Sequence, residues 1–241
     1  MSAAPCPRVR VTSDIADAAR CLQQGGLALF PTETFYAVGC LARCAGAVAR
    51  VYQVKQRPVQ RPLPLLAGSR EQLLPLVRLD AAPSGLLERF WPGALTVALP
   101  LLPDAAKTLS PALAAALSRE GLAAVRVSPH PAAAALARLA GGVLTSSSAN
   151  LSGHEAVRDP DALDPRLLQA LDGPHDVILA APPRPAGGLP STIVRPGSLG
   201  FLHVLRQGAV SLDSLRAAGF SVASSRPAPG DGEPPPPARV I

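Results

Sequence analysis

"TSDIADAARCLQQGGLALFP", residues 12–31, joins a helical pattern directly to a strand pattern and sets the fold class of the chain. Its first half repeats apolar residues at helical spacing, and Thr12 or Ser13 stands where a helix N-cap is expected. Gly25–Gly26 then predict the end of this helix, because glycine favours the backbone conformation that follows a helix. The apolar run at 27–30, closed by a proline, predicts a buried strand.

The same alternation of helical and strand-like patterns continues outward from this segment. Further helices are predicted at 45–55 and 129–141, with proline-interrupted helical patterns at 70–77 and 83–93. Further strands are predicted at 63–68, 95–102, 121–128, 141–149, 175–181, 191–196 and 201–208. Helices that alternate with strands, followed by clustered strands, predict an α/β (α+β) fold in which helices pack against a sheet.

The composition predicts one folded domain and a tail. The chain has 241 residues, of which 48% are hydrophobic and 17% charged, so residues 1–223 have enough apolar surface for a sizeable core. Residues 224–241 are rich in Pro and Gly, which predicts a disordered C-terminal tail. The net charge of +6 favours anionic partners such as nucleotides or RNA, although the preference for Arg over Lys also fits a GC-rich genome.

Several classes of function are poorly supported. The first residues lack the apolar stretch of a signal peptide, and no apolar run approaches the roughly 20 residues that cross a bilayer, so we expect a cytoplasmic protein without membrane contact. The four cysteines lack paired spacing and the four histidines are scattered, so no metal site is expected. GxSxG, HExxH, Walker A and GxGxxG motifs are absent from the sequence. Small hydroxyl residues and cations at strand ends remain as candidates for chemistry.

Hydroxyl groups gather where predicted strands end. FPTETFYAVG (30–39) presents Thr32 and Thr34 either at a sheet edge, where open α/β sheets bind ligands, or in a locally packed turn. LTSSSANLSG (144–153) either exposes backbone N–H groups to an anion or forms a plain serine-rich loop. Arg126 lies inside an apolar strand, where a buried charge needs a partner or a ligand.

Lys55, one of only two lysines in the chain, ends the helix predicted at 45–55. The helix dipole favours a cation at this position, which explains the residue without any function. Arg57 and Arg61 follow on a loop stiffened by prolines, and an ammonium beside guanidinium groups suits a polyphosphate. The segment therefore predicts either a phosphate site or an ordinary helix-end charge.

Seven short motifs occur in an order that matches one family. They are FPTETFYAVGCLA, VYQVKQRPVQRPL, FWPGALTVAL, VRVSPHP, SSSANLSG, STIVRP and LRQGAV. Over nearly all of residues 12–215, the chain resembles the YrdC/TsaC-like L-threonylcarbamoyladenylate synthases. The resemblance implies a single YrdC-like domain, whose twisted mixed β-sheet, flanked by helices, surrounds a basic concave groove.

The resemblance also implies a nucleotidyltransferase that makes threonylcarbamoyl-AMP and pyrophosphate from L-threonine, bicarbonate and ATP. In that chemistry the amine of threonine captures bicarbonate or CO₂, and the carbamate attacks the α-phosphorus of ATP, so no protein nucleophile is needed. ATP would bring Mg²⁺ with it. The product serves the threonylcarbamoyladenosine modification of tRNA, so the implied partners are tRNA or other RNA and downstream tRNA threonylcarbamoyl transferase proteins.

The matched motif positions imply specific contacts. The residues implied to bind ATP are Lys55, Arg57, Arg61, Ser148, Asn150 and Arg206, with Lys55 and Arg57 as catalytic residues at the surface of the groove. The residues implied to hold threonine are Thr32, Thr34, Arg126, Ser146 and Ser191, and Arg126 is the natural partner of its carboxylate. The resemblance implies no metal ligand from the protein itself.

Five positions depart from the family pattern. Arg61 replaces an Asn, Leu66 a His near the threonine, Ala37 a Gly, Arg195 an Asp and Gln207 a Pro. Most ATP-side positions are kept, whereas the amino-acid side is partly altered. Two alternatives therefore stay open, a nucleotide-binding paralogue that uses another amine and a non-catalytic module that binds double-stranded RNA.

Overall fold

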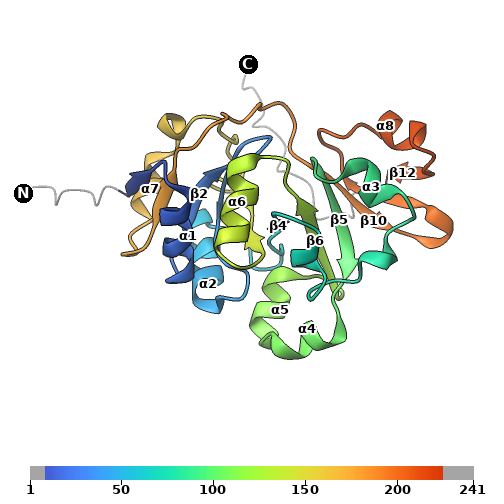
Figure 1. Cartoon of the computed structure of the whole chain (residues 1–241), viewed down its shortest axis with the longest axis horizontal. Helices are drawn as coiled ribbons and strands as arrows, with labels where there is room; N and C mark the ends of the chain where they lie inside the picture. Colours follow the sequence, from blue (N-terminus) through green and yellow to red (C-terminus); the bar gives the residue numbers. More distant parts are fainter. Residues whose placement is uncertain (1–8, 225–241) are drawn as a thin grey trace, which may run out of the picture.

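The computed structural model describes residues 9–224, without the side chains of residues 106–108 and 224. Within this range the chain forms a mixed α/β fold, which confirms the predicted fold class (Figure 1). The helices are α1 (Ile15–Gln23), α2 (Ala45–Lys55), α3 (Leu86–Phe90), α4 (Pro103–Thr108), α5 (Pro111–Leu117), α6 (Pro131–Leu139), α7 (Pro165–Gln169) and α8 (Leu212–Ala217). Short 3₁₀ turns occupy Glu71–Leu73, Leu79–Ala81, Pro160–Ala162 and Ser198–Gly200.

The strands divide into two sheets, where the sequence predicted one. The five-stranded sheet, called the first sheet, has the order β1 (Arg10–Thr12), β9 (Val177–Leu179), β2 (Ala28–Pro31), β3 (Tyr36–Gly39) and β8 (Ser147–Ser148). The seven-stranded second sheet has the order β12 (Val222–Ser224), β11 (Leu202–Arg206), β10 (Thr192–Pro196), β5 (Leu95–Pro100), β6 (Leu122–Val127), β4 (Leu65–Ala67) and β7 (Leu144–Thr145). Both sheets mix parallel and antiparallel neighbours.

The chain changes sheets at Ser146. The run predicted as one strand at 141–149 is two short strands, because β7 pairs with β4 of the second sheet and β8 pairs with β3 of the first. At this junction the backbones approach closely, and a Cβ on Gly39 would lie 1.8 Å from the carbonyl oxygen of Thr145. Only glycine fits at such a distance, so Gly39 lets the two sheets meet.

Helix boundaries follow local capping. The helix predicted from Thr12 or Ser13 begins later, because Asp14 is its N-cap and accepts a 2.8 Å hydrogen bond from the backbone of Ala16. Thr12 instead ends β1. Gly25 follows the helix with a φ of +82°, as its predicted role at the end of the helix requires. The prediction for 45–55 matches α2, while the helical patterns at 70–77 and 83–93 shrink to one 3₁₀ turn and the short α3.

Helix α6 fixes the two sheets relative to each other. It packs against β2 of the first sheet and β4 of the second, and it also packs against α1. Figure 1 shows α6 near the middle of the molecule, between the two groups of strands. Its alanines belong to the same buried hydrophobic cluster as Phe30 of β2 and Leu66 of β4. Because interiors are packed as densely as organic crystals, this cluster holds the sheets in one orientation.

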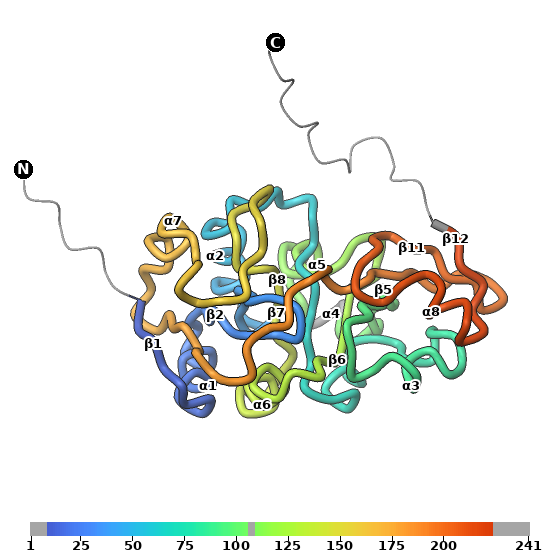
Figure 2. The backbone as a smooth tube through the Cα atoms, turned by 90° about the horizontal axis from the view of Figure 1, so that it is seen from above, coloured from blue at the N-terminus to red at the C-terminus, as the bar shows by residue number. Residues whose placement is uncertain are grey.

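Residues 180–191, between β9 and β10, carry the chain from the first sheet to the second, and Figure 2 shows this segment in orange. We call residues 182–190 the strap. Along it, Gly187 N donates to Thr34 O at 2.7 Å, and a nitrogen of the His130 ring lies 2.8 Å from Pro183 O. The strap is therefore fastened to the loop between β2 and β3 and to the start of α6.

Residues 9–224 contain no helix that is long and apolar enough to cross a membrane. The same residues contain no group of three or more His, Cys, Asp or Glu side chains placed to hold a metal ion. The predicted tail at 224–241 lies outside the described residues except for Ser224, which ends β12.

Candidate active site

A cavity of about 620 Å³ opens between the two sheets. One wall comes from the loop and strand at 32–37 and from the serines around β8, and the other wall comes from β5, β6, β10 and β11. Pro62 and Pro64, on the loop that follows α2, and Pro190 at the end of the strap also line it. Segments far apart in the sequence therefore form this cavity.

The wall from the second sheet is apolar because of strand alternation. The uncharged side chains that line the cavity from this wall are Ala98, Leu122, Ala124, Ile193 and Leu205. On β6 the residues between them, such as Ala123 and Val125, are fully buried in the main core. Successive side chains of a strand point to opposite faces, so one face of β6 serves the core and the other the cavity.

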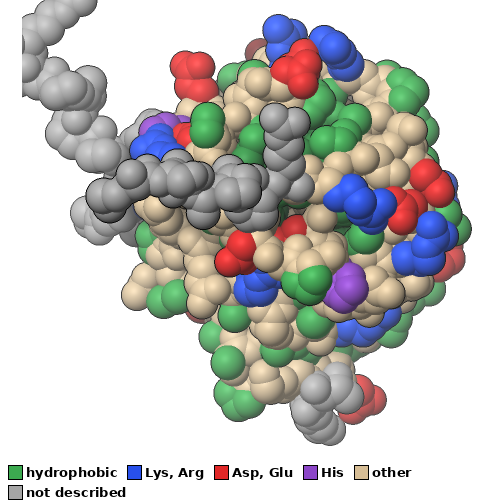
Figure 3. Space-filling view, turned by 90° about the vertical axis from the view of Figure 1, so that its left-hand side faces the viewer, with side chains coloured by type: hydrophobic (Ala, Val, Ile, Leu, Met, Phe, Trp, Pro, Cys, Tyr) green, Lys and Arg blue, Asp and Glu red, His purple; other side chains and the backbone are tan. Residues whose placement is uncertain are grey.

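Positive charge gathers in the cavity. Its lining includes five arginines, Arg57, Arg119, Arg126, Arg195 and Arg206, but among the described residues only one lining carboxylate, Glu120. By contrast, the face of the molecule in Figure 3 shows basic and acidic side chains lying next to one another. A concave site lined by one sign of charge concentrates its field, so this cavity attracts anions.

Most of the predicted site residues line this cavity. Those that do are Thr32, Thr34, Arg57, Arg126, Ser146, Ser148, Ser191 and Arg206. Lys55, Arg61 and Asn150 lie outside the lining. Asn150 lines a second, more open hollow together with His154 and Arg166.

Lys55 is buried, which corrects the prediction that it lies at the surface of the groove. Only 2% of the residue is exposed, and its Nζ donates to the carbonyl oxygens of Ser148 and Asn150, the latter at 2.5 Å. Asn150 Oδ1 lies 3.3 Å from Nζ and accepts from Ser148 Oγ at 2.5 Å. Burial, followed by the charge of Arg57, lowers the pKa of Lys55 to about 7, whereas the surrounding oxygens favour the protonated form. Lys55 thus holds the loop that carries Ser148.

Arg57 is held at the cavity by its own loop. Its Nε donates to Arg61 O and its Nη2 to Pro62 O, both at 2.9 Å. The hydroxyl of Tyr52 donates to the same Arg61 carbonyl at 3.1 Å. Arg61 therefore contributes its backbone to the orientation of Arg57, and its own side chain is exposed.

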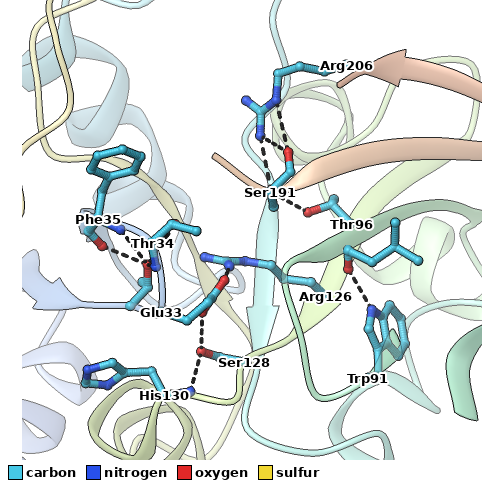
Figure 4. A network of polar contacts seen from close by, with 12 residues as sticks. Glu33, Thr34, Phe35, Trp91, Thr96, Arg126, Ser128, His130, Ser191 and Arg206 are labelled. Carbon is cyan, nitrogen blue, oxygen red and sulfur yellow. Dashed lines mark hydrogen bonds and ion pairs between the residues drawn. The ribbon is translucent and has the colours of Figure 1, made fainter. Parts of the chain in front are cut away.

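Ser191 and Arg206 form one polar group on the second sheet. Arg206 donates from Nη2 to Ser191 O at 2.7 Å and to Ser191 Oγ at 3.1 Å. Thr96 Oγ1 lies 2.9 Å from the same Ser191 hydroxyl, as Figure 4 shows. These bonds fix the serine at the start of β10 and the arginine at the end of β11 side by side.

Arg126 has the partner that its position in an apolar strand requires. It is 6% exposed, and its Nη1 forms an ion pair with Glu33 Oε1 (Figure 4). Glu33 Oε2 accepts a hydrogen bond from Ser128 Oγ at 2.9 Å. Burial, followed by the charge of Arg206, lowers the pKa of Arg126 to about 10, which leaves the guanidinium protonated at neutral pH.

The hydroxyl residues opposite Arg126 are also ordered. Thr32 Oγ1 donates to Phe35 O at 2.7 Å and lies 3.4 Å from Thr34 Oγ1. Ser146, at the junction of the two sheets, donates its backbone N–H to Pro64 O at 2.8 Å. Thr32, Thr34 and Ser146 are buried at the edge of the cavity.

Sequence reasoning missed some lining residues. Arg119 and Glu120 line the cavity from the turn before β6, where Glu120 has a φ of +55°. Sequence reasoning also missed Glu33, which does not line the cavity but pairs with Arg126 at its edge. An acidic residue between two strand-end threonines and a lone arginine in an apolar strand are complementary charges, and this signal could have paired them.

Of the five positions that depart from the family pattern, two line the cavity and three, including Arg61, do not. Ala37 and Arg195 line the cavity. Leu66 is fully buried in the cluster around α6, and Gln207 is exposed beyond the end of β11. Arg195 therefore adds a positive charge to the site, whereas Leu66 serves the core.

The fold and the site define a mixed α/β protein with an arginine-lined cavity between its two sheets. The Sua5/YciO/YrdC family model, described as "Telomere recombination", matches residues 20–208. Threonylcarbamoyl-AMP synthase of Stenotrophomonas maltophilia is 40% identical over 155 residues, covering 63% of this chain and 80% of the relative. The enzyme of the same name from Xanthomonas euvesicatoria is 37% identical over 168 residues, covering 68% and 86%.

Among solved structures, P. abyssi Sua5 complexed with L-threonine is similar, with a TM-score of 0.69 and 28% identity. The match covers 87% of this chain and 58% of that chain, so this chain spans little more than half of that protein. The chain belongs to the Sua5/YciO/YrdC family. The resemblance found in the seven motifs is thereby confirmed.

Proposed function

We propose that this protein is a threonylcarbamoyl-AMP synthase, a nucleotidyltransferase that converts L-threonine, bicarbonate and ATP into threonylcarbamoyl-AMP, pyrophosphate and water. The observation that carries the proposal is the cavity between the two sheets, where arginines and hydroxyl groups meet in a chain whose relatives bear this name. The two alternatives, a paralogue that uses another amine and a non-catalytic RNA-binding module, are not favoured by these relatives.

The nucleotide fits the side of the cavity formed by Arg57, Arg206 and Ser148. Each guanidinium can donate to phosphate oxygens through the N–H groups that its bonds to the protein leave free, and Ser148, whose hydroxyl donates to Asn150 Oδ1, lies on the same side. The apolar wall on β5, β6 and β10 suits the nucleoside. Glu120 is the single carboxylate among the described lining residues, so Mg²⁺ would be held mainly by the phosphates of ATP.

The amino acid fits the adjoining part of the cavity, among Thr34, Ser146, Arg126 and Ser191, whose hydroxyl accepts from Arg206 on the nucleotide side. Arg126 would pair with the carboxylate, as the resemblance implied, and the hydroxyl groups would donate to or accept from the remaining polar atoms. Thr32 lies behind Thr34 and supports it through the 3.4 Å approach of their hydroxyl oxygens. This placement brings the amine of threonine and the α-phosphate of ATP into one cavity.

The reaction then needs positioning and charge stabilisation from the protein. The amine captures CO₂ derived from bicarbonate, the carbamate oxygen attacks the α-phosphorus, and the bond to the β-phosphate oxygen breaks. Negative charge accumulates on the phosphates during this step, and Arg57 and Arg206 lie where they would stabilise it. Holding both reactants in one geometry supplies the remaining acceleration.

Three residues implied to contact ATP lie outside the lining, and we propose that they act through neighbours. Lys55 and Asn150 hold Ser148 through the hydrogen bonds at the loop, and Arg61 holds Arg57 through its carbonyl oxygen. They are positioning residues in this proposal. Direct contact of Lys55 with a phosphate stays a prediction from the motif.

The test is a pyrophosphate-release assay with L-threonine, bicarbonate and Mg·ATP, combined with mass spectrometry of the product. We expect threonine-dependent pyrophosphate together with threonylcarbamoyl-AMP, and a panel of other amino acids should give less. Pyrophosphate no higher than in the sample without threonine would contradict the proposal. The product would serve tRNA modification by downstream transferase proteins, as the resemblance implies, and the sequence predicts that this takes place in the cytoplasm.

A further inference from the structure

Glu33 lies where it can control the arginine that would receive the amino-acid carboxylate. Its Oε1 pairs with Nη1 of Arg126, and it lies on the loop between β2 and β3 while Arg126 lies on β6. The pair therefore crosses from the first sheet to the second. Glu33 itself is absent from the cavity lining, whereas Arg126 is part of it.

Both oxygens of the Glu33 carboxylate have a partner, because Oε1 pairs with Arg126 and Oε2 accepts from Ser128. Ser128 Oγ donates to Oε2 at 2.9 Å, and Ser128 is 2% exposed. The backbone of the same loop is held by the strap, because Ala186 N donates to Glu33 O at 3.3 Å and Gly187 N donates to Thr34 O at 2.7 Å. A carboxylate held in this way can impose one orientation on its partner.

Arg126 is held at one edge and open at the other. Its Nη1 forms the ion pair with Glu33, and within residues 9–224 no hydrogen bond engages Nε or Nη2. The residue lines the cavity, so its remaining donors are available to a ligand there. Figure 4 shows the guanidinium between Glu33 and the group formed by Ser191 and Arg206.

We propose that Glu33 is the positioning residue that presents Arg126 to the carboxylate of the substrate amino acid. The inference rests on the proposed function and goes beyond it by assigning a role to a residue that does not touch the substrate. Without the carboxylate, a buried guanidinium beside Arg206 has no anion to hold it, and it would lose its fixed orientation. A preorganised arginine binds its ligand more tightly because less conformational entropy is lost on binding.

The same geometry favours a carboxylate over a neutral group. Glu33 pairs with Nη1 of Arg126, so the edge formed by Nε and Nη2 can offer parallel N–H groups to a planar anion. An amino alcohol such as L-threoninol lacks that anion. The benefit of Glu33 should therefore appear with L-threonine and vanish with L-threoninol.

The experiment measures the dissociation constants of both ligands by calorimetry on the full chain, alongside the KM values for threonine and ATP. Glu33→Gln keeps the shape of the side chain and removes its charge. We expect it to weaken L-threonine about tenfold or more, a change of about 1.4 kcal/mol per tenfold, and to leave L-threoninol and the KM for ATP within about twofold. Glu33→Asp should recover part of the threonine affinity, because it restores the charge.

Two further variants separate positioning from loss of fold. Glu88→Gln removes the partner of a surface arginine, Arg70, at 3.0 Å, and should leave both ligands unchanged. Ser128→Ala removes the hydrogen bond that fixes Glu33 without leaving a charge unpaired, and should weaken threonine about threefold. If Glu33→Gln fails to fold, the threonine affinity of Ser128→Ala tests whether Glu33 positions Arg126.

A folded Glu33→Gln protein that binds threonine as the wild type does, or more tightly, would overturn the inference. So would equal weakening of L-threonine and L-threoninol, or a folded Ser128→Ala protein with unchanged threonine affinity. A wild type that binds threonine but releases no pyrophosphate would contradict the proposed function alone, because the dissociation constants still test Glu33. A wild type that binds no amino acid would overturn both.

Discussion

Replacing Lys55 by methionine tests whether this lysine supports the fold as well as the site. Methionine keeps the unbranched apolar chain and removes the ammonium group. In the native protein that group donates to Ser148 O and Asn150 O and lies 3.3 Å from Asn150 Oδ1. The substitution leaves two carbonyl oxygens of the loop without this donor.

The size of the effect follows from the bonds lost. At pH 10 Lys55 is neutral in the folded protein, because its pKa there is about 7, and its amine can still donate to the two carbonyl oxygens. A hydrogen bond from a neutral donor contributes about 0.5–1.5 kcal/mol, and an unsatisfied buried carbonyl costs about 1–3 kcal/mol. We expect Lys55→Met to lower the free energy of unfolding at pH 10 by about 2–4 kcal/mol, or the Tm by about 5–15 °C for a domain of this size.

Urea and thermal unfolding followed by circular dichroism measure this change. Arg43→Met is the matched control, because Arg43 is an exposed cation that donates to a backbone carbonyl, Gly141 O, at 2.8 Å. It should change the free energy of unfolding by less than about 1 kcal/mol. If Lys55→Met has the Tm of the wild type, the loop does not depend on Lys55, and its role must lie wholly with the ligand.

Three further predictions concern charge and packing. Burial lowers the pKa of Lys55 from 10.5 to about 7, so the unfolded chain binds more protons than the folded protein between these pH values. The free energy of unfolding of the wild type, relative to that of Lys55→Met, should therefore rise with pH across this window, by at most about 1.4 kcal/mol per pH unit. Urea unfolding at several pH values measures this difference, and a falling or flat difference would contradict the pKa shift. Arg57→Ala should lower kcat about 100-fold in the pyrophosphate assay, because it removes charge stabilisation at the phosphates, and circular dichroism should show an intact fold. An unchanged kcat would place the phosphate site elsewhere. Leu66→His should lower the free energy of unfolding by about 2–4 kcal/mol, because Leu66 is fully buried in the cluster around α6. An unchanged free energy of unfolding, measured with urea, would show that this position faces the cavity.

Local patterns in the sequence were sufficient for many elements. The helix predicted at 45–55 and the strand predicted at 27–30 follow from periodicity and turn residues, and their physical causes lie within a few residues, whereas β3 was not predicted. The N-cap of α1 was placed one or two residues too early, because three consecutive polar residues could each cap and only the backbone decides among them.

The separation of strands into two sheets could not be read from the sequence. A run such as 141–149 has the apolar and polar content of one strand, but its two halves pair with β4 and β3. Pairing partners are chosen by tertiary packing, chiefly of α6 against both sheets. The same choice creates the cavity, since its walls belong to different sheets.

The site divides in the same way. By itself, the sequence determined which residue types would form it, because the motifs supplied arginines and hydroxyl groups at strand ends and placed a charge at Arg126 that required a partner. The tertiary structure decided which side chain that partner is, and Glu33 and Ser128 meet although they lie 95 positions apart. It also decided that Lys55 is buried rather than exposed, because the loop at 148–150 folds over it. Burial and pairing depend on which segments meet in space, and no local pattern records that.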